Sequence, residues 1–149
     1  MKIAISHRGN TDGPIEDLEN SPSYILKTLD LGLCVETDVW YIDNQWYLGH
    51  DSPQYQTNIE FLNRDRLILH AKNLAALYEL TIMKEQLHYF WHENDDFTLT
   101  SRGMIWTYPN KEVTNRSIIV CTSKEDALVY KEKSCFGICT DYITSVVES

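Results

Sequence analysis

The chain has 149 residues, of which 43% are hydrophobic and 23% charged, and this composition predicts one soluble globular domain over residues 1–149. Its formal net charge of −9 argues against broad nucleic-acid binding and against docking on an anionic membrane. No apolar run approaches the roughly 20 residues that cross a bilayer, and no signal peptide is recognisable. The four cysteines form no Cys-x-x-Cys pair, so we expect a cytoplasmic protein with free thiols.

Strand-like and helix-like segments alternate along the chain, which predicts an α/β domain with parallel strands. In the first half we expect strands at residues 2–6, 33–41 and 46–49, and a helix from Ser21-Pro22 to Gly32. In the second half we expect strands at residues 67–69, 88–91, 97–100, 104–107, 118–121 and 135–139. Two further helices are expected, one opened by Ser123 and one capped by Asn73 with Leu74, Leu77 and Tyr78 on its apolar side.

Four of the five histidines stand where a predicted strand ends: His7, His50, His70 and His92. Ligands of parallel α/β proteins bind beyond the carboxyl ends of the strands. The pattern therefore predicts one functional edge at which these histidines gather. His88 begins a strand instead, and we expect it to have a structural role.

Glu36 and Asp38 occupy positions i and i+2 of an otherwise apolar strand, so both side chains point to the same side. Two carboxylates on one face repel each other and lose solvation, and a hard cation such as Mg²⁺ or Ca²⁺ would relieve both costs. A strand with one solvated face, or one with a basic neighbour, would explain the pair equally well.

Two further strand ends carry residues suited to phosphate chemistry. His50-Asp51 has the arrangement of a catalytic base beside its orienting carboxylate, although a polar turn has the same composition. In His7-Arg8-Gly9, the guanidinium of Arg8 suits phosphate oxygens and His7 can exchange a proton near neutral pH. A surface turn remains the alternative for this triplet.

The order and spacing of these residues resemble the glycerophosphodiester phosphodiesterase family, which shares the fold of the phosphatidylinositol phospholipases C. The matched residues run from HRGN at position 7 through LENSPSYILKTLDLGLCVETDVWYIDNQWYLGHD, which ends at position 51. The likeness returns at residues 69–72, LHAK, and at residues 137–142, GICTDY, which resemble the closing strand of the family.

The resemblance implies a hydrolase of small-molecule phosphodiesters, with a place in lipid metabolism and a divalent cofactor, Mg²⁺, Ca²⁺ or Mn²⁺. The roles that it implies are general acid and base for His7 and His50, metal binding for Glu36 and Asp38, phosphate binding for Arg8 and Lys72, and support for Glu19, Asn20 and Asp51. In this family the substrate's own neighbouring hydroxyl is often the nucleophile, and the two histidines take and return the proton.

The chain departs from the family in two respects. His70 stands where a third metal carboxylate is usual, and an imidazole favours Mn²⁺ or a similar ion, weakens Mg²⁺ binding, or leaves the third place to Glu93. The family fold is a (β/α)₈ barrel, typically of about 250 residues. We therefore expect a reduced or incomplete TIM barrel, of the phospholipase-C-like phosphodiesterase type, with several helices replaced by loops or hairpins.

Three more residues are candidates for the pocket. His92 and Glu93 stand at the expected functional edge, although an acidic solvated loop would also explain residues 90–97. Trp106 either fills the core or forms a wall beside the leaving group.

Two other functions remain open. A lyase similar to sphingomyelinase D would stop at a cyclic phosphate, and a non-catalytic module would bind phosphate esters without turnover. No interface signature is visible, so the sequence leaves the oligomeric state open.

Overall fold

The computed structural model describes residues 1–148, which form ten strands and five helices. The strands are β1 (Ile3–His7), β2 (Cys34–Ile42), β3 (Gln45–Leu48), β4 (Tyr55–Thr57), β5 (Leu67–Ala71), β6 (Tyr89–Phe90), β7 (Phe97–Leu99), β8 (Ile105–Thr107), β9 (Ser117–Cys121) and β10 (Gly137–Thr140). The helices are α1 (Pro22–Asp30), α2 (Ile59–Leu62), α3 (Leu74–Ile82), α4 (Lys124–Lys131) and α5 (Ile143–Glu148).

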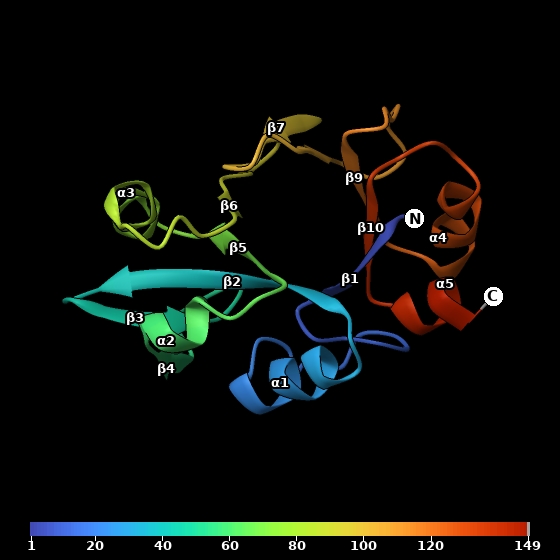
Figure 1. Ribbon diagram of the computed structural model, residues 1–149. Helices are drawn as coiled ribbons and strands as arrows, with labels where there is room; N and C mark the ends of the chain where they lie inside the picture. The colour runs from blue at the N-terminus through green and yellow to red at the C-terminus, as the bar shows by residue number, and fades with distance from the viewer. Residues whose placement is uncertain (149) are drawn as a thin grey trace.

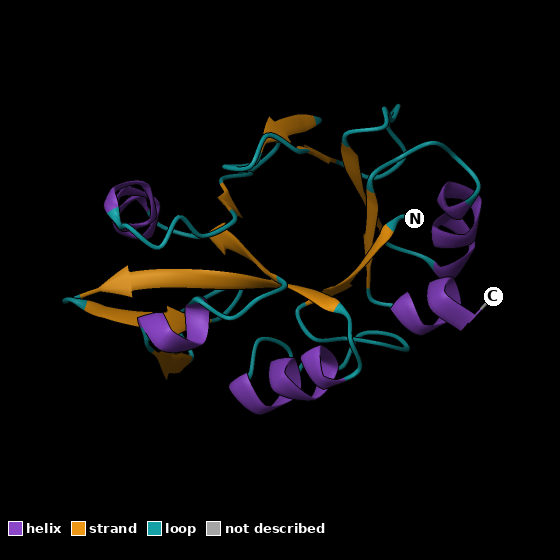
Figure 2. Cartoon of the chain, viewed as in Figure 1, coloured by secondary structure: helices purple, strands orange, loops and turns teal. Residues whose placement is uncertain are grey.

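Seven strands run parallel and curl into a ring, in the order β6–β5–β2–β1–β10–β9–β8. The helices lie on the outside of this ring (Figure 1). Strand β2 extends beyond it and forms an antiparallel meander with β3 and β4, and β7 pairs antiparallel with β8. Figure 2 shows that loops replace helices on the β6–β8 side. The fold is a mixed α/β incomplete TIM barrel, as the sequence predicted.

The ring has a seam between β6 and β7, where the described residues form no strand ladder. Individual hydrogen bonds cross this seam. The backbone N–H of Ser101 donates to the carbonyl of Tyr89 (2.8 Å), and the N–H of Tyr89 donates to the Ser101 hydroxyl (2.9 Å). The Thr98 hydroxyl donates to the carbonyl of Trp91 at 3.0 Å. These hydrogen bonds join residues 89–91 to residues 98–101 in place of a regular strand pair.

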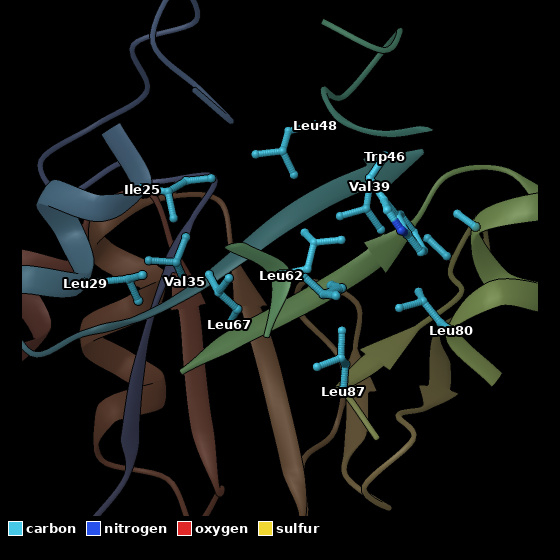
Figure 3. Packing of buried hydrophobic residues seen from close by; sticks show 13 residues of the cluster. Ile25, Leu29, Val35, Val39, Trp46, Leu48, Leu62, Leu67, Leu80 and Leu87 are labelled. Atoms are coloured by element: carbon cyan, nitrogen blue, oxygen red, sulfur yellow. The ribbon is translucent and has the colours of Figure 1, made fainter. Parts of the chain in front are cut away.

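The core lies on both sides of the sheet. Inside the ring, six parallel strands each contribute one buried side chain: Ile5, Ile68, Phe90, Trp106, Ile118 and Cys139. Outside it, Ile25 and Leu29 of α1 pack against Val35, and Leu80 of α3 joins the same cluster (Figure 3). Full burial of one such aliphatic side chain stabilises the fold by roughly 1.5–3 kcal/mol. This outer cluster packs β2, which carries the two candidate metal carboxylates, against α1 and α3.

Local signals place the helix starts. The Ser21 hydroxyl accepts a hydrogen bond from the Tyr24 N–H, Pro22 follows in the first turn, and Ser123 caps α4 in the same way through the Asp126 N–H. The short elements β4, α2 and α5 were not predicted. No helix within residues 1–148 has the length and apolarity needed to cross a membrane.

The predicted apolar side of α3 is wrong in part. Leu77 packs against the core cluster as predicted, but the helix buries Ala76 and Leu80, whereas Leu74 is 76% and Tyr78 58% exposed. The cause is Asn73, whose side chain caps the Ala76 N–H and also bonds both backbone groups of Tyr41 at 3.2 and 2.9 Å. This double attachment ties the first turn of α3 to β2 and fixes which side of the helix meets the sheet.

Candidate active site and metal centre

A cleft of about 380 Å³ opens at the carboxyl ends of the parallel strands. It brings together nine of the residues singled out in the sequence: His7, Arg8, Glu36, His50, His70, Lys72, His92, Glu93 and Trp106. Glu19, Asn20 and Asp51 line an adjoining cavity, which shares Arg8 and His50 with the cleft. Asp38 lines neither the cleft nor the cavity, because its side chain is fully buried. The histidines that end separate strands therefore share one edge of the barrel.

Strand register assembles the candidate metal ligands. Asp38 on β2 stands directly opposite His70 on β5, and Glu36 stands opposite His7 on β1. One donor atom from each of Glu36, Asp38 and His70 lies within 4.8 Å of the others, and Glu93 is outside this group. His70 Nδ1 is 3.1 Å from Asp38 Oδ1 and 3.9 Å from Glu36 Oε1.

The two carboxylates are buried, with Glu36 2% and Asp38 0% exposed. Among the described residues, Glu36 Oε2 and Asp38 Oδ1 have no hydrogen-bond partner. Burial and the neighbouring Asp38 raise the pKa of Glu36. Burial alone would also raise the pKa of Asp38, but His70 in its protonated form, Arg8 and the Asn20 amide bring it below its usual value. The orphaned Oδ1 of Asp38 lies beside the His70 imidazole nitrogen, with a Glu36 carboxylate oxygen in the same cluster. These three ligand atoms fit a divalent cation.

His7 is held by an acid from the end of β10. Its Nδ1 lies 2.9 Å from Asp141 Oδ1, so the carboxylate accepts the Nδ1 hydrogen. Its Nε2 is 3.7 Å from Glu36 Oε2 and faces the cleft. Burial lowers the pKa of His7, but the Asp141 hydrogen bond and the Glu36 charge outweigh it, and the net change is upward. His7 is thus set up to exchange a proton through Nε2.

His50 has the same kind of partner. Its Nδ1 lies 2.8 Å from Asp51 Oδ1, which leaves Nε2 available. The preceding Gly49 is fixed from two directions: its N–H donates to the carbonyl of Asp38 at 3.1 Å, and its carbonyl accepts from the Trp40 indole at 2.7 Å. Unlike Asp141, Asp51 is 95% exposed. Solvent therefore screens this His–Asp pair much more than the pair at His7.

The two candidate phosphate-binding cations differ in their surroundings. The Arg8 Nε lies 3.2 Å from Asp38 Oδ2, and its Nη1 lies 3.1 Å from Glu19 Oε2. The backbone of Arg8 has φ of 58°, a strained conformation for a residue with a side chain. Lys72 lines the cleft and belongs to none of the ion pairs found within residues 1–148. Arg8 therefore neutralises carboxylates, and Lys72 offers its charge to the cleft.

Asn20 supports the site from beneath. Its amide donates to Asp38 Oδ2 at 2.9 Å, while its side-chain oxygen accepts from the Thr37 hydroxyl (2.7 Å) and the Asp38 N–H (3.1 Å). The side chain is buried, and its backbone has φ of 64°, which asparagine tolerates better than most residues. Asn20 thus fixes the backbone and the carboxylate of Asp38 together.

Stacked rings form one wall of the cleft. The His70 ring stacks on Phe90, with centroids 4.7 Å apart, and Phe90 stacks on Trp106 at 4.2 Å. Trp106 is buried in the ring core and also lines the cleft, so both expectations for it describe part of its position. His92 stacks on Tyr108 at 5.2 Å. The wall gives the cleft an apolar side beside its charged one.

Sequence reasoning did not assign two residues that the structure places in the site. Asp141 holds His7, and Asn10 bridges the carboxylates of Asp141 and Glu19 at 2.8 and 3.0 Å. Asp141 directly follows β10, and this position at the end of a strand was the available signal. Asn10 stood in the matched HRGN segment, but its bridging role was not assigned, because a buried bridging amide looks like any loop asparagine in a sequence.

No family model matches the chain, and no curated protein matches its sequence. Among solved structures, the chain is similar to a protein from Silicibacter pomeroyi DSS-3 that bears the name "Putative glycerophosphoryl diester phosphodiesterase". The two share 13% sequence identity with a TM-score of 0.59, and the match covers 98% of this chain and 92% of that chain. The comparison therefore establishes a common fold, which agrees with the incomplete barrel described above.

Proposed function

We propose that this protein is a metal-dependent phosphodiester hydrolase that acts on small glycerophosphodiester-like substrates. One observation carries the proposal: His7 and His50, each with Nδ1 bound to a carboxylate, line the same cleft as the Glu36, Asp38 and His70 donor set. The fold shared with a protein named for this activity supports the same conclusion.

The two histidines supply acid and base. Because Asp141 and Asp51 accept the Nδ1 hydrogens, Nε2 of each ring remains as the atom that exchanges protons. One Nε2 takes the proton from a hydroxyl of the substrate next to the phosphate, and that oxygen attacks phosphorus. The other Nε2 gives a proton to the departing alkoxide, which leaves a cyclic phosphate. In a second step the two histidines exchange roles, and a water molecule opens the ring to give the phosphate monoester. General acid–base catalysis of this kind contributes about 10²- to 10⁴-fold.

Positive charge around the phosphate stabilises the reaction. Lys72 contributes an ammonium group to the cleft, and Arg8 keeps Asp38 ionised. A divalent ion held by Glu36, Asp38 and His70 would add charge beside the non-bridging phosphoryl oxygens. The stacked rings of Phe90 and Trp106 give the cleft an apolar wall.

The direct test is hydrolysis of glycerophosphocholine, glycerophosphoethanolamine and glycerophosphoinositol with Mg²⁺, Ca²⁺ or Mn²⁺ supplied. Phosphorus NMR identifies the product: an open phosphate monoester supports the proposed hydrolase, and an accumulating cyclic phosphate indicates a lyase. Binding of these esters by calorimetry, with no turnover under any of the three ions, would show a binding module instead.

The assigned roles are tested by His7→Ala and His50→Ala, each expected to lower kcat by about 10²-fold or more. His88→Gln is the matched control, because His88 is a buried histidine that does not line the cleft. A p-nitrophenyl phosphodiester distinguishes the two roles: its leaving group needs no proton, so loss of the acid costs little with this substrate. Unchanged turnover in both alanine variants would overturn the assignment.

A further inference from the structure

The His70 ring is fixed in one tautomer and one orientation. Its Nε2 lies 3.0 Å from the backbone carbonyl of His92, and a carbonyl only accepts, so Nε2 carries the hydrogen. The ring plane is held parallel to Phe90, at an interplanar angle of 13°. In the neutral ring the lone pair is therefore on Nδ1, the atom that faces Asp38 and Glu36.

The Asp38 carboxylate, which lies opposite this nitrogen, has one satisfied oxygen and one free oxygen. Asp38 Oδ2 accepts from the Asn20 amide and lies beside the Arg8 guanidinium, so it is already satisfied. Oδ1 is buried and has no hydrogen-bond partner in residues 1–148, although His70 Nδ1 is only 3.1 Å away. The Nδ1 lone pair and the anionic Oδ1 therefore face each other without a well-aligned hydrogen between them. Because both atoms are electron-rich, the position next to them favours a cation.

We infer, building on the proposed function, that His70 makes this centre selective for a d-block divalent ion such as Mn²⁺, Fe²⁺, Co²⁺ or Zn²⁺ over Mg²⁺ and Ca²⁺. Mg²⁺ and Ca²⁺ prefer sets made of oxygen atoms alone, and Ca²⁺ takes six to eight of them. Imidazole nitrogen suits the d-block ions. The hydrogen bond from Nε2 to a backbone carbonyl is the outer contact that metal-bound histidines usually make, and it raises the basicity of the ligating nitrogen.

Metal binding is measured directly, without substrate. The electron paramagnetic resonance signal of free Mn²⁺ disappears as the ion binds, which gives its dissociation constant, and Mg²⁺, Ca²⁺ and Zn²⁺ are then added as competitors. We expect Mg²⁺ and Ca²⁺ to bind at least about tenfold more weakly than Mn²⁺, because both prefer ligand sets made of oxygen atoms alone. Equal or tighter binding of Mg²⁺ or Ca²⁺ would overturn the inference.

The nitrogen ligand has its own signature. Electron spin echo modulation of bound Mn²⁺ should show coupling to ¹⁴N, replaced by ¹⁵N coupling when the protein contains ¹⁵N-labelled histidine. His70→Asp should remove the coupling and shift the preference toward Mg²⁺ and Ca²⁺. His50→Ala removes another cleft imidazole, and this variant should retain the nitrogen coupling and the preference for Mn²⁺. Absence of nitrogen coupling in the parent protein would refute the role of His70 even if the aspartate variant failed to fold.

The two proposals fail separately. Nitrogen-coupled Mn²⁺ without phosphodiester turnover would leave the metal assignment standing and defeat the hydrolase. Turnover supported by Mg²⁺ or Ca²⁺, with no nitrogen coupling to Mn²⁺, would keep the hydrolase and defeat the selectivity.

Discussion

The Nδ1 atom of His7 lies 2.9 Å from Oδ1 of Asp141, although the two residues are 134 positions apart in the chain. Their strands explain the contact. β1 and β10 are parallel neighbours, with Ser6 opposite Thr140, so the next residue of each strand stands at the same height above the barrel. Asp141 is ionised, because although burial raises its pKa, His7 and the Asn10 amide lower it further.

Asp141→Asn should lower kcat about 100-fold, because the neutral amide no longer fixes the His7 tautomer or stabilises its charged form. The pKa of His7, followed by NMR, should fall in the same variant. Asp51→Asn is the matched control: its carboxylate is exposed, and its turnover should stay within about fivefold of the parent. Equal losses of kcat in the two variants would contradict the expectation that the His7–Asp141 pair contributes more than the His50–Asp51 pair.

Gly49→Ala should displace His50 and lower turnover while most of the fold survives. Gly49 has φ of 152°, and an added Cβ would lie 2.0 Å from the carbonyl oxygen of Ser52. The loop that carries His50 must therefore shift. Gly13→Ala is the control, since its φ of 109° is also unfavourable but its Cβ would meet only Tyr142, at 3.5 Å. Kinetics and circular dichroism on both variants separate displacement of His50 from general strain.

Asn20→Ala should lower the free energy of unfolding by about 2–3 kcal/mol, because it leaves the buried Asp38 carboxylate and the Thr37 hydroxyl without their amide partner. Asn110→Ala controls for the backbone, since exposed Asn110 also has positive φ, at 65°. Urea unfolding gives both values. A difference below about 0.5 kcal/mol between the two would mean that the Asn20 side chain contributes little beyond its backbone conformation.

Acidification should destabilise the protein through His88. Burial and the charge of Arg102 lower the pKa of His88 from 6.5 to about 4, and its Nε2 bonds the Thr100 hydroxyl at 2.8 Å. Between these pH values the unfolded chain takes up a proton that the folded chain does not. The free energy of unfolding therefore falls as the pH drops from 6.5 to 4, by about 3 kcal/mol from this group.

The variant His88→Gln keeps a hydrogen-bonding side chain without the titration. Its stability should depend less on pH over that interval, while carboxylates contribute equally to both proteins. Urea unfolding at half-unit pH steps provides the comparison. Parallel stability curves for the parent and the variant would exclude His88 as the source of the acid sensitivity.

Much of the barrel could be predicted because its physical signals are local. Apolar runs that end in polar residues identified the parallel strands, and Ser21, Asn73 and Ser123 identified three helix starts. The same rule placed His7, His70 and His92 at one edge, since parallel strands end there. His50 reaches that edge differently, because it follows β3, which runs antiparallel to β2. Short elements such as β4 and α2 were missed, since three or four residues are too few to show a period.

Contacts between distant segments were beyond the reach of the sequence. The pairing of Arg8 with Glu19 and Asp38 depends on a left-handed backbone at Arg8, which no local pattern signals in a non-glycine residue. The exposed side of α3 was mispredicted because Asn73 bonds Tyr41, 32 residues earlier. Asp141 stood in a recognised closing strand, but its role required knowing that β10 lies next to β1.

The pairing of β1 with β10 also determines when the site can exist during synthesis on the ribosome. A chain that has emerged only as far as α4 contains His7, Glu36, Asp38 and His70, but β1 still lacks its neighbour and His7 lacks its carboxylate. Contacts this distant in sequence form late, after a long loop has been closed. The candidate site of the nascent protein is therefore incomplete until its last parallel strand has left the exit tunnel and docked.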